Sequence, residues 1–188
     1  SDVSILHRSF NQGKSWDFTS LIAIDMEGKY SQMHGINFNE TNILNCGNGH
    51  LIAAIRGDTT FYTTDKTFMP VGGVGKIYIS HSHDGGLCWS KPYDSGIFGQ
   101  PAQLNLLKNG DILLTYGYRK KPYGTRISIS KDLGRTWEKP ILISREFNIW
   151  DCGYPSTIEI DHNKFLTVYY GADEKLTRGI EYTYWELL

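Results

Sequence analysis

The amino-acid sequence predicts an all-β protein built from repeated four-stranded units. Helical periodicity is scarce, whereas short runs rich in Ile, Val, Leu, Tyr and Thr recur between turn signals. Hairpin turns recur too, and so does a glycine-containing motif that ends in tryptophan. A repeat of about 45–50 residues with four strands per unit is typical of β-propeller blades, each packing against its neighbours around a channel.

Hairpins are predicted at three places where turn residues separate two apolar runs. Asn-Gly dipeptides mark the first two, and both dipeptides suit the positive φ angles of tight turns. Three comparable hairpins indicate an internal repeat. The turns are Asn48-Gly49 between 43–46 and 51–55, Asn109-Gly110 between 104–107 and 112–116, and Asp161-His162-Asn163 between 157–160 and 165–169.

An eight-residue pattern, S-x-D-x-G-x-x-W, recurs behind these hairpins, and we call each copy a clasp. The Asp or Asn side chain can accept backbone N–H bonds across the turn, the Gly allows a left-handed backbone, and the Trp packs inward. We expect these residues to be structural. The copies are 9–16, with Asn11 and Trp16, 82–89, with Asp84 and Trp89, and 130–137, with Asp132 and Trp137.

The remaining strands complete the repeat. They are expected at 3–8, 18–24, 76–81, 92–97, 125–130, 140–144 and 179–185. Taken in order, the elements predict one propeller fragment over 1–188, about three to four blades long. It consists of a half-blade over 1–25, blades over 36–98 and 101–145, and a partial blade over 153–188.

Composition excludes several classes of partner. The 188 residues carry 19 Lys+Arg against 20 Asp+Glu, a formal net charge of -1. Without a basic run, binding of nucleic acid through phosphates is not expected, and no apolar stretch approaches the roughly 20 residues of a membrane helix. Cys46, Cys88 and Cys152 are odd in number and widely spaced, which fits neither a disulfide framework nor a zinc ribbon. We expect three buried thiols.

The clasps and the four-stranded repeat resemble the sialidases, whose clasps are known as Asp boxes or BNR repeats and whose fold is a six-bladed propeller. In that family the clasps lie at the periphery, so they indicate fold more than function. Six blades of roughly 48 residues need about 290 residues. The resemblance therefore implies that this chain is the C-terminal portion, and that a missing N-terminal half carries one binding arginine and the acid Asp.

Sialidases act on a sugar that bears a carboxylate on its anomeric carbon, which would repel the carboxylate nucleophile of most retaining glycosidases. The family uses a Tyr hydroxyl as nucleophile, activated by a neighbouring Glu. Three arginines hold the substrate carboxylate, and an Asp supplies the acid.

Residues 39–56 resemble the sialidase segment that begins N-E, runs through a strand and an N-G or D-G turn, and ends in Arg. Glu40 falls on the base and Arg56 on one of the three arginines. The alternative is that Glu40 is a solvated loop carboxylate and Arg56 a surface charge at a strand end.

Residues 152–170 resemble the sialidase strand that carries the nucleophile, and Tyr154 occupies its place. This segment departs from the family pattern at Pro155, at the His162-Asn163 turn, and at Gly171, where the family often has Glu. The alternative is a Tyr that packs beside Pro155 at the start of a strand.

The third arginine of sialidases comes from the junction that 116–124 occupies here. Arg119 is its best counterpart, and Arg126, inside a strand, is the alternative. Tyr118 and Tyr123 could add a platform for a sugar ring, since aromatic faces bind pyranose rings. Residues 81–84, His-Ser-His-Asp, offer metal ligands, but Asp84 belongs to a clasp, so no metal site is predicted.

The resemblance implies an exo-acting, retaining glycoside hydrolase that cleaves terminal sialic acid or a related acidic sugar from glycoconjugates. The partner is then a glycan with a carboxylate, no cofactor is needed, and the location is secreted or periplasmic. We expect the isolated chain to be inactive. The alternative is a non-catalytic carbohydrate-binding propeller or a glycosidase of another specificity, which the weak match around Arg119 leaves open.

Overall fold

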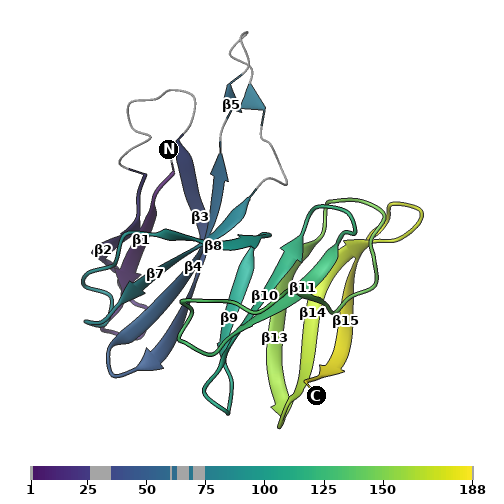
Figure 1. The fold of residues 1–188 in the computed structure, drawn as a ribbon. Helices are drawn as coiled ribbons and strands as arrows, with labels where there is room; N and C mark the ends of the chain where they lie inside the picture. Colours follow the sequence, from purple (N-terminus) through teal and green to yellow (C-terminus); the bar gives the residue numbers. More distant parts are fainter. Residues whose placement is uncertain (1, 26–34, 60, 63–67, 70–74, 188) are drawn as a thin grey trace.

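The computed structural model describes residues 2–25, 35–59, 61–62, 68–69 and 75–187. Within them the chain is all-β, as predicted, and four antiparallel sheets follow one another along the sequence and stand side by side in an arc (Figure 1). No helix in these ranges is long and apolar enough to cross a membrane.

The sheets contain two, four, four and three strands, and a small β5–β6 ribbon extends from the second. All the predicted strands are found, but the strands of the first and third hairpins are longer than expected: 43–46, for example, is the end of a strand that begins at Ile36. The expected strand 140–144 pairs only at Ile141–Leu142. The strands are β1 (Ser4–Arg8), β2 (Asp17–Ala23), β3 (Ile36–Gly47), β4 (His50–Thr59), β5 (Phe61–Tyr62), β6 (Phe68–Met69), β7 (Lys76–Ser82), β8 (Tyr93–Phe98), β9 (Ala102–Leu106), β10 (Ile112–Tyr118), β11 (Gly124–Ser130), β12 (Ile141–Leu142), β13 (Gly153–Asp161), β14 (Lys164–Ala172) and β15 (Arg178–Glu186).

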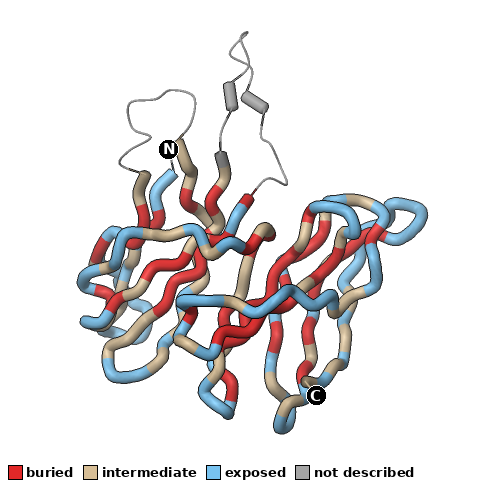
Figure 2. Tube along the Cα trace, in the orientation of Figure 1, coloured by how far each residue is buried: buried red, intermediate tan, exposed pale blue. Residues whose placement is uncertain are grey.

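The hydrophobic core lies in layers between successive sheets (Figure 2). β10 is buried on both faces because it lies between two neighbouring sheets: Ile112, Leu114 and Tyr116 pack toward the sheet of β4 and β7, and Leu113 packs with Phe165 of β14. A strand covered on both faces reads as a continuous apolar run, which is why this hairpin was visible in the sequence.

The turns differ in one detail from the expectation. Asn48 and Gly49 both have positive φ, 50° and 77°, as predicted. In the second dipeptide only Gly110 does, because the loop is longer: the Leu107 N–H donates to the Asp111 carbonyl, and Asn109 Oδ1 accepts the Asp111 N–H. Asn109 therefore stabilises this turn through its side chain rather than through a left-handed backbone.

Each clasp is closed by a side-chain oxygen that accepts several donors. Asp132 Oδ1 accepts the Ser130 hydroxyl and the N–H groups of Arg135 and Thr136, at 2.7, 3.0 and 2.8 Å. Asp84 makes the same three bonds in its copy. Asn11 Oδ1 accepts the Ser9 hydroxyl and the Ser15 N–H, while the Lys14 N–H bonds to the Asn11 carbonyl. These contacts are local, so they form wherever the eight-residue pattern occurs.

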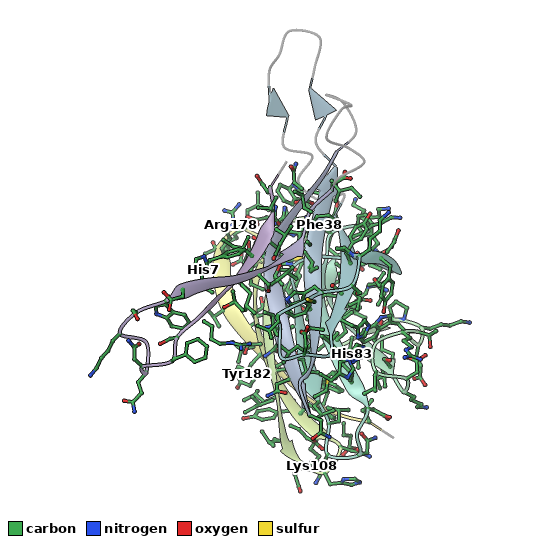
Figure 3. All side chains as sticks on the ribbon, turned by 90° about the vertical axis from the view of Figure 1, so that its left-hand side faces the viewer. His7, Phe38, His83, Lys108, Arg178 and Tyr182 are labelled. Atoms are coloured by element: carbon green, nitrogen blue, oxygen red, sulfur yellow. The ribbon has the colours of Figure 1, made fainter. Side chains whose placement is uncertain are left out.

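The clasp tryptophans do not all pack inward. Trp89 packs against the core beneath β1 and β2 and donates from Nε1 to Ser20 Oγ at 3.1 Å, and Trp137 packs against the next core layer. Trp16 is 62% exposed, so the prediction was wrong for this copy. Its loop extends sideways, away from the other sheets (Figure 3), and nothing in the described chain covers it.

The expectation of three buried thiols was also wrong. Cys152 is buried and Cys46 half-buried, but Cys88 is exposed. Cys88 lies in a clasp, where its backbone N–H bonds to Asp84, so the fold uses its main chain and leaves the side chain at the surface.

Replacing Asp132 with Ala is expected to lower the melting temperature by about 2–4 °C, as for loss of a cap worth about 1 kcal/mol. Bonds from the hydroxyl and N–H of Thr136 lower the pKa of Asp132 to about 2, from 3.8. Because the pKa of Asp132 is lower in the folded protein, its ionised carboxylate stabilises the fold at pH values above 3.8. This stabilisation is lost as the pH falls toward 2. Thermal unfolding should therefore show a smaller deficit at pH 2.5 than at pH 7, whereas the exposed Glu186→Ala on β15 should show none at either pH.

Candidate active site

Four of the predicted site residues come together near the point where the first strands of three sheets converge. Glu40 lies on β3, Arg56 on β4, and Tyr154 on β13, and Arg119 directly follows β10. Glu40 and Tyr154 border an open pocket of about 450 Å³ between β3, β9 and β13. Its remaining lining residues are Thr41, Asn42, Pro101, Ala102, Gln103, Pro155 and Ser156.

Glu40 and Tyr154 share an unusual backbone. Both have positive φ, 43° and 47°, in a region that side chains other than Gly rarely adopt. Each also lies in a bulge: β3 loses register with β4 between Asn39 and Asn42, and β13 loses register with β14 between Gly153 and Ser156. A bulge re-aims a side chain that regular pairing would direct elsewhere, and strain of about 1–3 kcal/mol per residue persists only where the surroundings enforce it.

The two re-aimed side chains meet. The Tyr154 hydroxyl donates to Glu40 Oε1, although 114 positions separate them in the sequence. The other oxygen, Glu40 Oε2, accepts from Arg56 NH1 at 2.8 Å. The Glu40 carboxylate thus accepts a hydrogen bond from the Tyr154 phenol and forms an ion pair with the Arg56 guanidinium.

A close approach of two glycines brings Arg119 to the same place. A Cβ on Gly117 would lie 2.8 Å from the Cα of Gly153, so neither position has room for a side chain without a shift. The end of β10 therefore touches the start of β13. Arg119 is 9% exposed there and donates from Nε to the Cys152 carbonyl at 3.2 Å.

The surroundings of Tyr154 favour the protonated form of its phenol. Burial raises the pKa of Tyr154, the hydrogen bond and charge of Glu40 raise it further, and Arg56 and Arg119 oppose this. A protonated phenol is a weak nucleophile, so its attack requires a base at the moment of bond formation. Glu40 is within hydrogen-bond contact of that proton, and Tyr154 is 52% exposed and open to a ligand.

Asp58 is a site residue that the sequence reasoning missed. It follows Arg56 by two positions on β4, so both side chains project from the same face, and Asp58 Oδ2 accepts from Arg56 Nε at 2.6 Å. Burial raises the pKa of Asp58, while the charges of Arg56 and Arg119 lower it. The i, i+2 spacing in a strand was the available signal. Arg56 is thus bound to two carboxylates, whereas Arg119 has no ion pair with a described residue.

Three further residues around Arg119 were also missed. Asp151 accepts from the Tyr170 hydroxyl and from Arg178 Nε, and the Tyr170 ring lies 6.0 Å from the Tyr154 ring. Trp150 is 46% exposed, with the Arg119 guanidinium 5.6 Å from its ring centroid. An exposed tryptophan backed by a cation is a surface on which a sugar ring can stack.

Tyr118, Tyr123 and Arg126 lie in more enclosed surroundings. Tyr118 is half-buried against the core, with the Arg126 guanidinium 3.9 Å from its ring centroid. Tyr123 packs against buried Phe147. The exposed aromatic surface next to Arg119 therefore comes from Trp150, and Arg126 is engaged with Tyr118.

No group of three or more His, Cys, Asp or Glu in the described ranges is arranged to hold a metal ion. His81 and His83 stack with His50 instead, and Asp84 closes its clasp. A second pocket of about 510 Å³ lies between β2 and the neighbouring sheet. It is lined mostly by apolar side chains and contains none of the predicted catalytic or substrate-binding residues, although the clasp residue Trp89 lines it.

No protein-family model and no curated protein matches this sequence. Among solved structures, the chain is similar to a protein of unknown function from Dyadobacter fermentans, with 25% identity, a TM-score of 0.77, and coverage of 98% of this chain and 45% of that one. It is similar to the Hadza microbial sialidase Hz136, with 16% identity, a TM-score of 0.67, and coverage of 97% and 39%. It is also similar to a xylan β-1,4-xylosidase from Bacillus halodurans, with 15% identity, a TM-score of 0.61, and coverage of 97% and 35%.

The chain spans less than half the length of each of these proteins. The likeness establishes the fold, part of a β-propeller of the kind found in glycoside hydrolases. A sialidase and a xylosidase share it, so the fold does not select the reaction. The substrate and the chemistry have to be argued from the side chains at the site.

Proposed function

We propose that this chain supplies the nucleophile, the base and two carboxylate-binding arginines of an exo-acting, retaining glycosidase that removes terminal sialic acid or a related acidic sugar. The contact between the Tyr154 hydroxyl and Glu40 carries this proposal. It joins residues from two separate strands, each in a bulge with a left-handed backbone, and a purely structural role gives no reason for that arrangement.

The proposed reaction proceeds in two steps. In the first, the Tyr154 oxygen bonds to the anomeric carbon, its proton passes to Glu40, and the glycosidic oxygen leaves with a proton from an acid outside this chain. In the second, water attacks the anomeric carbon and gives a proton to the conjugate base of that same acid, while the carbon–oxygen bond to Tyr154 breaks and the proton on Glu40 returns to the phenol. Arg119 and Arg56 hold the sugar carboxylate in both steps.

A neutral nucleophile suits an anionic sugar. Two carboxylates, Glu40 and Asp58, already lie beside Arg56. A third negative charge from an ionised nucleophile would oppose a substrate carboxylate, whereas a protonated Tyr154 does not. The acidic substrate and the tyrosine therefore support each other as proposals.

Covalent trapping tests the proposal on the full-length protein. An acidic sugar fluoride with a second fluorine beside the anomeric carbon should glycosylate Tyr154: the carbon–oxygen bond forms, fluoride leaves, and the phenol proton passes to Glu40. Trypsin releases 146–164, which contains Tyr154 and no other tyrosine, so mass spectrometry should find one added glycosyl unit on this peptide.

Two controls define the outcome. A neutral sugar fluoride of the same pattern should label poorly, and Tyr154→Phe should not be labelled. Labelling of a different peptide, with turnover of an aryl sialoside, would remove Tyr154 from the role of nucleophile. Salt-sensitive binding of acidic sugars without labelling or turnover would instead support a carbohydrate-binding propeller.

A further inference from the structure

Beside Arg56 lies a set of buried polar atoms that the proposed reaction does not use. Gln100, in the connection from β8 to β9, is 1% exposed, and its backbone N–H donates to the Gly117 carbonyl at 2.8 Å. Both polar atoms of its side chain, and Oδ1 of Asp58, are buried without a hydrogen-bond partner in the described chain. Polar groups buried without a hydrogen-bond partner destabilise a fold, so such an arrangement calls for a pairing.

The unpaired groups border one small space over Gly75. A Cβ at Gly75 would lie 1.4 Å from Gln100 Oε1 and 2.7 Å from Asp58 Oδ1. The amide of Gln100 and the free oxygen of Asp58 are therefore neighbours. A half-turn of the amide exchanges its oxygen and nitrogen, and places an N–H donor against the Asp58 carboxylate.

We infer that Gln100 donates to Asp58 and, through it, positions Arg56. The bonds then form one line from the buried connection to the pocket: Gln100 to Asp58, Asp58 to Arg56, Arg56 to Glu40, and Glu40 to Tyr154. Gln100 fixes the Asp58 carboxylate, which holds Nε of the guanidinium. NH1 then binds Glu40 Oε2, and Oε1 stays available to the phenol. Glycine at 75 leaves room for the amide.

The contact itself can be tested without any catalytic activity. In the 15N-labelled full-length protein, the Arg56 Nε–H signal, identified by its loss in Arg56→Lys, should be shifted downfield and protected from exchange by the Asp58 carboxylate. Gln100→Leu, which keeps side-chain volume, should move this signal upfield and speed its exchange by about 10-fold or more, because an unheld carboxylate turns away. Backbone amide signals away from Gly75 should stay in place, which shows that the variant folds.

The second readout rests on the proposed function and uses the full-length protein. Gln100→Leu should lower kcat by about 10-fold with KM changed less, since the line reaches the Glu40–Tyr154 pair rather than the substrate. Gln100→Glu sets a carboxylate against Asp58 and should lose more. The exchange Asp58→Asn with Gln100→Glu should recover part of that loss, because amide and carboxylate then face each other again.

An unchanged Arg56 Nε–H signal in Gln100→Leu overturns the inference, whatever the activity. Equal kcat in all variants overturns the positioning role. If the signal shifts as expected while the unmodified protein hydrolyses no acidic glycoside, the contact stands and the proposed function fails.

Discussion

Replacing Tyr154 with Phe is expected to reduce kcat of the full-length protein by at least about 1,000-fold, equivalent to about 4 kcal/mol of transition-state free energy. The change removes one oxygen, the atom that bonds to the anomeric carbon, and leaves the ring in place. The ring lies 6.0 Å from that of Tyr170, and its surroundings accept a phenylalanine of the same shape. KM should change by less than about 3-fold, since the ring remains and the arginines are untouched.

Initial rates with an aryl sialoside measure this effect, and Tyr182→Phe is the matched control. Tyr182 is an exposed tyrosine of β15 that contacts Tyr184 rather than the pocket, so its rate should equal that of the unmodified protein. Comparable rates for Tyr154→Phe and Tyr182→Phe would show that another group forms the covalent bond. A Tyr154→Phe protein with normal kcat and a tenfold higher KM would assign the hydroxyl to substrate binding instead.

The sequence is most informative about this fold where the contacts are local. Hairpins and clasps are local: Asn48-Gly49 and Asp132 form their contacts with residues a few positions away, so the pattern alone located them. Burial of β10 on both faces follows from its unbroken apolar run. The strands of the repeat were therefore all located, although four hairpin strands are longer than predicted, and the propeller fragment followed from counting them.

The site required long-range information that no local pattern contains. Glu40 and Tyr154 were found by resemblance, but the bulges that aim them result from pairing with β4 and β14 and leave no mark in the residues themselves. Asp58 and Gln100 were missed because their importance depends on which side chains meet across the fold. The prediction that Trp16 packs inward was wrong for a similar reason. The clasp motif predicts its own turn, but it does not predict whether another sheet covers the tryptophan.

Replacing Arg119 with Met is expected to lower kcat/KM for an acidic aryl glycoside by about 100-fold or more, mainly through KM. Arg56 is already bound to two carboxylates, whereas Arg119, among the described residues, bonds to the Cys152 carbonyl and has no ion pair, and it lies near Trp150. Of the two arginines, Arg119 therefore has the positive charge that is less neutralised by protein carboxylates, and we expect it to contribute more to binding the substrate carboxylate. Methionine retains most of the apolar stem, so the loss reports on the guanidinium rather than on packing.

Arg126→Met is the matched control, and it separates the two arginines that the sequence left as alternatives. The guanidinium of Arg126, which is on β11, lies over the ring of Tyr118 on β10, so its loss should change kcat/KM by less than about 3-fold. Raising the salt concentration should weaken substrate binding by the unmodified protein and by Arg126→Met, but have little further effect on Arg119→Met, because the screened contact is already absent. If Arg126→Met has the larger effect, the carboxylate is held from β11, and the acidic end of the sugar must lie over Tyr118 rather than beside Trp150.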